Sequence, residues 1–138
     1  MLEQFQTQFL RWMALTQPSF RPILPSDPTA PEVNLSEIRK LFFQFTELFR
    51  WAVQMVGKKK GEERILRTQM ENSIRFAQVG ATRGSLSRVE REIKNSNIDT
   101  VNQLSQLEAE IAVLEGLAAG YNAALTSLSR EITIRLGK

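Results

Sequence analysis

Apolar residues recur at every third and fourth position through the C-terminal part of the chain. They are Leu104, Leu107, Ile111, Leu114, Ala118, Tyr121, Leu125, Leu128 and Ile132. Spacings of three and four alternate without interruption, which places these side chains on one stripe of an α-helix that must pack against another helix. Only Gly116 and Gly120 weaken this helix, each by about 1 kcal/mol relative to alanine. We therefore predict a long, coiled-coil-like helix over about 98–136, with this stripe as its packing seam.

A second helix is predicted over about 35–56. Asn34 followed by Glu37 has the spacing of a capping box, which marks a helix start. Apolar residues cover its main face, and a second apolar face carries Phe43, Trp51 and Met55. A helix that is apolar on two faces is buried on more than one side, and a surplus of aromatic residues is typical of protein interfaces. We expect this helix either to lie centrally in a bundle or to meet another subunit with its second face.

The segment from Gly57 to Gly61 is predicted to be a solvated loop between two helices. Its three lysines, Lys58, Lys59 and Lys60, follow a helix C-terminus, where positive charge is favourable. A cluster of this kind also suits phosphate groups, and Arg64 and Arg67 come shortly after it. Both interpretations, a solvated loop and a set of phosphate contacts, stay open from the sequence.

A third helix is predicted over about 62–94. Gly80 and Gly84 lie four residues apart, so a break between two shorter helices near these glycines is the alternative. The next break, at 95–97, is short, and a short connection makes neighbouring helices pack antiparallel. The third helix and the C-terminal helix are therefore expected to form a hairpin.

Residues 1–16 are predicted to form a short amphipathic docking helix. Its apolar stripe consists of Phe5, Phe9, Trp12 and Met13. Residues 17–33 contain all five prolines, which favours an extended linker with a reach of roughly 40–50 Å. Through this linker the helix either covers the core of its own chain or grips a neighbouring subunit, and the sequence leaves both arrangements open.

The amino-acid composition excludes most of the common catalytic mechanisms. The chain has neither cysteine nor histidine, so thiolate nucleophiles, the usual general base and the commonest metal ligands are missing. No motif has the spacing of a metal or nucleotide site. The carboxylates Glu108, Glu110 and Glu115 occupy the e and g positions of the seam helix, where solvated charges normally lie. We therefore expect no catalytic residues, no metal and no cofactor, and a protein that is not an enzyme.

The charge distribution and the hydropathy of the chain indicate its expected partners and location. The net charge is +3, and residues 58–94 carry ten basic and five acidic side chains. The arginines of this region are spread around the helix, which argues against a dedicated nucleic-acid face. The chain has no uncharged apolar run of about 18 residues and no signal-peptide pattern at its start, so we expect no transmembrane segment. The expected location is the cytoplasm, or a particle assembled there.

These patterns predict an all-α fold: an elongated helical hairpin or bundle over 34–138 with a proline-rich N-terminal arm. The function expected for it is structural, as a subunit that oligomerises through helical packing within a larger complex, with the arm docking on a neighbour. Virion, injection-machine and secretion components contain subunits of this general kind, which is an analogy of fold alone. Partners would be other copies of the chain or other subunits. The alternative is a small helical subunit of a ribonucleoprotein complex that uses the basic region 58–94.

Overall fold

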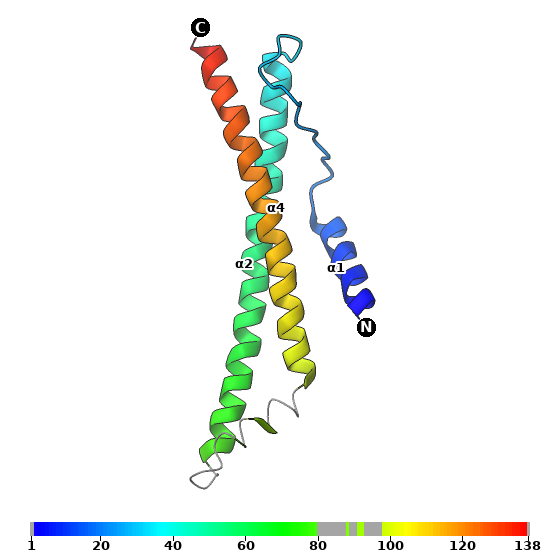
Figure 1. Ribbon diagram of the computed structural model, residues 1–138, viewed down its shortest axis with the longest axis vertical. Helices are drawn as coiled ribbons and strands as arrows, with labels where there is room; N and C mark the ends of the chain where they lie inside the picture. The colour runs from blue at the N-terminus through cyan, green and yellow to red at the C-terminus, as the bar shows by residue number, and fades with distance from the viewer. Residues whose placement is uncertain (1, 80–87, 89–90, 93–97, 138) are drawn as a thin grey trace. The chain divides into compact units, whose positions relative to one another are not determined.

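The structure, a computed structural model, describes residues 2–79, 88, 91–92 and 98–137, with the backbone alone at 2–6 and 77–79. Its helices are α1 (Leu2–Thr16), α2 (Leu35–Val79) and α4 (Ile98–Leu136) (Figure 1). The described residues contain no strand, and the C-terminal helix packs on the central one, so the predicted all-α hairpin is confirmed. Contacts divide the chain into two compact units: unit 1 is Met1–Val56 with Val113–Lys138, and unit 2 is Gly57–Ala112.

Helix α2 starts where the capping box predicts. The backbone N–H of Glu37 donates to Asn34 Oδ1 at 2.8 Å, and Asn34 Nδ2 donates to Glu37 Oε1 at 3.4 Å. The first helical hydrogen bond follows, from Ile38 N to the Asn34 carbonyl at 3.2 Å. The bond to Asn34 Oδ1 satisfies one of the backbone donors that a helix start leaves unpaired, so residues near in sequence mark this boundary.

The loop predicted at 57–61 is wrong, because α2 runs without interruption from Leu35 to Val79. Two glycines cost a helix only about 1 kcal/mol each, and the lysines between them are good helix formers. Charged pairs along and across the helix offset that cost: Lys59 lies 2.9 Å from Glu110, and Glu63 pairs with Arg67 four residues later. The predicted helix boundary at residue 62 is wrong for the same reason. The predicted break near Gly80 to Gly84 and the turn at 95–97 lie outside the described residues.

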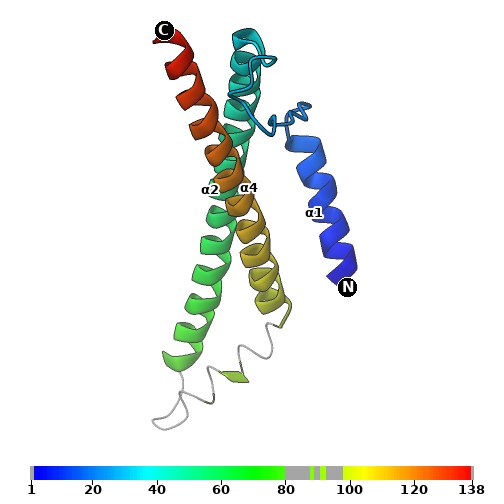
Figure 2. The ribbon, with the colours of Figure 1, turned by 45° about the horizontal axis from the view of Figure 1, so that its top comes forward.

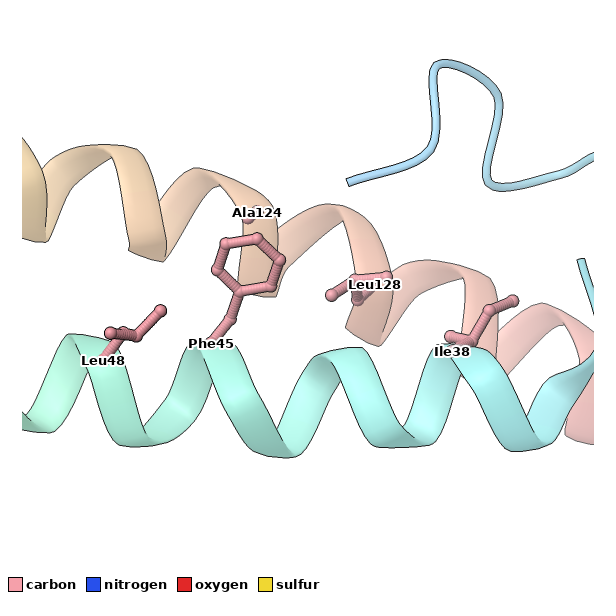
Figure 3. Close-up of a cluster of buried hydrophobic side chains, with 5 residues drawn as sticks. All are labelled: Ile38, Phe45, Leu48, Ala124 and Leu128. Carbon is pink, nitrogen blue, oxygen red and sulfur yellow. The ribbon is translucent and has the colours of Figure 1, made fainter. Parts of the chain in front are cut away.

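The core of unit 1 forms where α2 and α4 run antiparallel, side by side in both views (Figures 1 and 2). Near the start of α2, its side chains point toward those of the last part of α4, and the buried set is Ile38, Phe45, Leu48, Ala124 and Leu128 (Figure 3). Further along α2, Trp51 and Ala52 pack against Leu114. Residue numbers rise on one helix as they fall on the other, which is the signature of an antiparallel pair.

The predicted seam of α4 faces inward along its whole length. Five of its residues are buried (Leu104, Leu107, Ile111, Leu114 and Leu128), and Ala118, Tyr121, Leu125 and Ile132 are partly buried. Leu114 and Leu128 have no exposed surface at all. Within unit 1 these residues meet apolar side chains of α2, as a heptad seam requires.

The linker 17–33 is not an open tether. It contains no helix or strand and has turns near Pro28 and near Pro31. Leu24 and Val33 pack against the core of unit 1, and Asp27 Oδ1 accepts a hydrogen bond of 3.1 Å from the backbone N–H of Thr29. The linker therefore turns near two of its prolines and packs against unit 1, which differs from the extended connector expected from the sequence.

Helix α4 is long and apolar enough to cross a membrane when judged by length and composition alone. Its most apolar window of 18 residues has a mean hydropathy of 1.2, and only 22% of that window is buried. The expectation of no transmembrane segment is based on the absence of an uncharged apolar run. The mean hydropathy of a window can stay high even when the window contains one charged residue such as Glu115. Core helices of soluble proteins pass the same test of length and composition.

Candidate protein-interaction site

Helix α1 packs on a hydrophobic surface that α2 and α4 build together in unit 1. We call this surface the arm site, and its residues are Trp51, Ala52, Met55, Val56, Leu114, Leu117, Ala118 and Tyr121. Trp51, Ala52 and Leu114 form its buried floor, and the others line it. Three side chains of α1 cover this floor: Phe9, Trp12 and Met13. They stand at positions i, i+3 and i+4, which is one face of a helix.

The aromatic residues give the contact its shape. Phe9 and Trp12 stack with ring centroids 5.9 Å apart and planes inclined by 21°. Tyr121 of the arm site also lies next to Phe45 of α2, with their ring centroids 6.2 Å apart. Large rings bury much area while losing little side-chain entropy, so a short helix can be held by few residues. By contrast, Leu10 and Leu15 of α1 are 60% and 87% exposed.

Two hydrogen bonds fix the C-terminal end of α1 on the arm site. Trp51 Nε1 donates to Thr16 Oγ1 at 3.2 Å, and Gln17 Nε2 donates to the Tyr121 hydroxyl at 3.1 Å. One bond reaches α2 and the other reaches α4. The apolar contact gives affinity, and these bonds give α1 a defined register.

The residues predicted for docking are therefore brought together within one chain. Phe9, Trp12 and Met13 lie on the arm site, while the side chain of Phe5 lies outside the described part of the structure. Trp51 and Met55 of the predicted second face lie beneath α1, so the partner of that face is the chain's own arm. Phe43 is 57% exposed and meets Phe20 of the linker edge to face, at 6.0 Å between centroids.

Arg135 clamps the end of the linker to the C-terminal turn of α4. Its guanidinium donates to the carbonyls of Pro28 at 3.0 Å, of Ala30 at 3.2 Å and of Val33, and to the carboxylate of Glu131 at 2.7 Å. Arginine suits this role because its planar group carries five donors in a fixed arrangement. The role of Arg135 was not predicted from the sequence, because its acceptors are backbone carbonyls, which every residue has.

In unit 2, two of the cations predicted to contact phosphates face carboxylates instead. Lys59 Nζ lies 2.9 Å from Glu110 Oε2, and both side chains are mostly buried, with 13% and 11% of their surface exposed. Arg67 pairs with Glu63 at 3.0 Å and with Glu108. Lys58, Lys60 and Arg64 are exposed on α2. The prediction of a solvated carboxylate is therefore wrong for Glu110, which is buried, whereas Glu108 and Glu115 are exposed.

The described surface also has grooves away from the arm site. Two grooves of unit 1, of about 580 and 350 Å³, share Thr126, Arg130 and Ile134 of α4. In unit 2, a groove of about 400 Å³ is lined by charged residues that include Lys60, Glu63 and Arg64. Among the described residues, no group of three or more side chains is placed to hold a metal ion.

The arm site is thus a hydrophobic docking surface for a short amphipathic helix, with two polar anchors and no reactive group. Known proteins add nothing to this description: no family model matches the chain. Searches of curated proteins and of solved structures also found no match.

Proposed function

We propose that the protein is a non-enzymatic assembly subunit whose arm site receives the α1 helix of a neighbouring copy. The observation that carries the proposal is the way α1 is held. Three side chains, Phe9, Trp12 and Met13, and two hydrogen bonds attach it to the arm site. A surface that binds α1 of its own chain binds the identical helix of another copy through the same contacts, which is the principle of domain swapping.

The energetics of α1 suit an exchangeable arm. A helix of 15 residues is marginal in water by itself, so α1 depends on its docking site for stability. A fully buried apolar side chain contributes roughly 1.5–3 kcal/mol, and the side chains of Phe9, Trp12 and Met13 are only partly buried. The hold on α1 is therefore strong enough to order the helix and weak enough to open locally.

The linker provides the reach for such an exchange. Arg135 fixes the chain between Pro28 and Val33, so residues 17–27 form the part that can swing out. At no more than about 3.6 Å per residue, this segment spans at most roughly 40 Å. That distance allows α1 to reach an adjacent subunit while the body of the chain keeps its own core.

The ribonucleoprotein alternative has less support. Lys59 belongs to the predicted set of phosphate contacts, and its side chain is mostly buried against Glu110 of unit 2. Arg67 is exposed but faces Glu108. These carboxylates offset part of the positive charge, and the salt-dependent affinity for nucleic acid rises with the number of cations that contact phosphate.

The test compares matched variants of α1 in the full chain. Phe9→Ser with Met13→Ser removes two side chains from the arm site, whereas Leu10→Ser with Leu15→Ser changes the same helix where it is exposed. Oligomeric state is measured by light scattering over a series of concentrations. We expect the first pair to lower the oligomeric state and the second pair to leave it unchanged. A chain that is monomeric throughout, and that unfolds when Phe9 and Met13 are replaced, would show that the arm serves only its own core.

A further inference from the structure

The side of α4 that carries no seam residue is exposed along unit 1. We call this side the outer face; its central residues are Gly116, Ala119, Ala123, Thr126 and Arg130, and all five are exposed. Their spacings alternate between three and four, as those of the buried seam do. At 3.6 residues per turn the two stripes fall on nearly opposite sides of the helix. A side chain added at Gly116 would meet no atom within 4 Å, so no part of the described chain covers this point.

The outer face carries few charges for an exposed helix surface. Surface helices usually carry charged residues opposite their buried stripe. From Ile111 to Arg130 the only charged residues of α4 are Glu115 and Arg130, and both are exposed.

These two charges identify what fits the outer face. They have opposite signs and lie 15 positions apart, so they are separated by about 22 Å along one helix and cannot pair within it. When a second α4 lies antiparallel, centred close to Ala123, Arg130 of each helix comes within about one turn of Glu115 of the other. A parallel second helix would instead place like charges at the same level, which is unfavourable.

Glu115 also has a polar or electrostatic interaction within its own chain. This interaction is compatible with a second one, because a carboxylate has two oxygens that accept several hydrogen bonds. Between the two charges, the small side chains of Ala119 and Ala123 let two helices approach closely. The geometry thus points to an antiparallel interface between two copies of this chain, formed by the outer faces of their α4 helices. This inference rests on the proposed function in assembly, and it names a second surface, separate from the arm site.

A bilayer is the other environment that could cover a helix face with so few charges. The outer face is bordered by Glu115, Asn122 and Ser129, all exposed. A carboxylate inside a bilayer is costly, whereas the same group in a protein interface can pair with an arginine. The charge pattern therefore favours a second copy.

The experiment reverses the two charges in the full-length chain. We expect Glu115→Arg and Arg130→Glu each to weaken dimer formation by about tenfold or more, because each change turns two reciprocal attractions into repulsions. The double variant and an equimolar mixture of the two single variants should both recover an affinity close to that of the unchanged chain. Sedimentation over a concentration series measures the affinities, and circular dichroism checks that the single variants keep their helicity.

Cysteine cross-linking tests the orientation, since the natural chain has no cysteine to interfere. In an antiparallel pair that brings Glu115 level with Arg130, Ala119 lies near Thr126 of the other copy. A mixture of Ala119→Cys and Thr126→Cys should form a disulfide-linked dimer under mild oxidation, and Ala119→Cys alone should not. Linkage of Ala119→Cys to itself would overturn the antiparallel arrangement.

Three further outcomes would overturn the inference. One is a dimer affinity that neither single charge reversal changes, and another is a chain that stays monomeric at every concentration. The third is uptake of a monomeric chain by phosphatidylcholine vesicles, which would assign the outer face to lipid. The α1 variants separate this inference from the proposed function. If replacing Phe9 and Met13 lowers the oligomeric state while the charge reversals do not, the arm acts in assembly and the outer face does not. If instead the charge reversals lower the oligomeric state and the α1 variants do not, the outer face acts in assembly and the arm does not.

Discussion

Trp51 in the middle of α2 donates a hydrogen bond of 3.2 Å from its indole nitrogen to the hydroxyl of Thr16, the last residue of α1. The same hydroxyl donates to the carbonyl of Trp12 at 2.9 Å. The Thr16 hydroxyl thus donates to a carbonyl in the last turn of its own helix and accepts a hydrogen bond from the indole N–H of the buried Trp51. This relationship defines where α1 stops on the arm site.

Replacing Thr16 with valine should lower the free energy of unfolding by about 1 kcal/mol, because the indole N–H of Trp51 loses its acceptor without a loss of volume. Thr16→Ser keeps the hydroxyl and serves as the matched control. Urea denaturation followed by tryptophan fluorescence measures both variants. Equal stability of the valine and serine variants would mean that this hydrogen bond contributes nothing to holding α1.

Arg135→Met should release the linker from the end of α4. The substitution removes donors from three backbone carbonyls and leaves the carboxylate of Glu131, which is 7% exposed, without its cation. An unpaired buried group costs about 1–3 kcal/mol, so we expect a loss of that size. Limited digestion with a glutamate-specific protease should also cleave faster after Glu32, which lies between the Ala30 and Val33 carbonyls that Arg135 binds.

The control for the Arg135 prediction is Arg39→Met, which changes an exposed arginine at the start of α2. It should leave both the stability and the rate of cleavage unchanged. Arg135→Lys is informative as well, because one ammonium group cannot reproduce the fork of donors. If Arg135→Lys behaves as the natural chain does, the planar clamp is not what holds the linker.

Local patterns were sufficient to predict the parts of the fold that depend on neighbouring residues. The start of α2 follows from Asn34 and Glu37, which are three positions apart. The inward side of α4 follows from a heptad that includes Leu114 and Leu128, both fully buried. The capping contact lies within one helical turn, and the seam contacts repeat along the helix. The spacing of residues in the sequence is therefore enough to predict both.

Contacts between distant segments could not be predicted in this way. The lysines between Gly57 and Gly61 resemble a loop until Lys59 is seen to face Glu110 on another helix. Arg135 binds carbonyl groups, which every residue has, so nothing in the sequence marks its partners. The apolar stripe of α1 was visible, but its place on Trp51 and Leu114 depends on how α2 and α4 pack.

Lys59→Met should destabilise unit 2 more than Arg67→Met. The pair of Lys59 and Glu110 is mostly buried, with 13% and 11% of its side-chain surface exposed, whereas the pair of Arg67 and Glu108 is 49% and 54% exposed. Removing one partner of a buried pair costs roughly 3 kcal/mol or more, and exposed pairs contribute no more than about 1 kcal/mol.

Thermal unfolding at low and high salt measures the difference between these two pairs. Salt should change the contribution of Arg67 more than that of Lys59, because exposed charges are screened and buried ones much less. The double variant Lys59→Met with Glu110→Leu should recover much of the stability, since it leaves no unpaired charge. Equal losses for Lys59→Met and Arg67→Met would contradict the burial of the first pair.

Binding of nucleic acid, where it can be detected, should be weak, sensitive to salt and independent of sequence. Of the predicted phosphate contacts, Lys58, Lys60, Arg64 and Arg67 are exposed on α2, and four such contacts give a slope of the logarithm of affinity against that of salt no steeper than about −4. Fluorescence anisotropy of a labelled oligonucleotide over a range of salt concentrations measures this slope. Replacing all four cations with alanine should abolish binding, whereas Arg39→Ala, which changes an exposed arginine outside the basic region 58–94, should retain most of it. Nanomolar, sequence-selective binding at physiological salt would instead favour the ribonucleoprotein alternative, since a few phosphate contacts alone cannot produce that affinity or that selectivity.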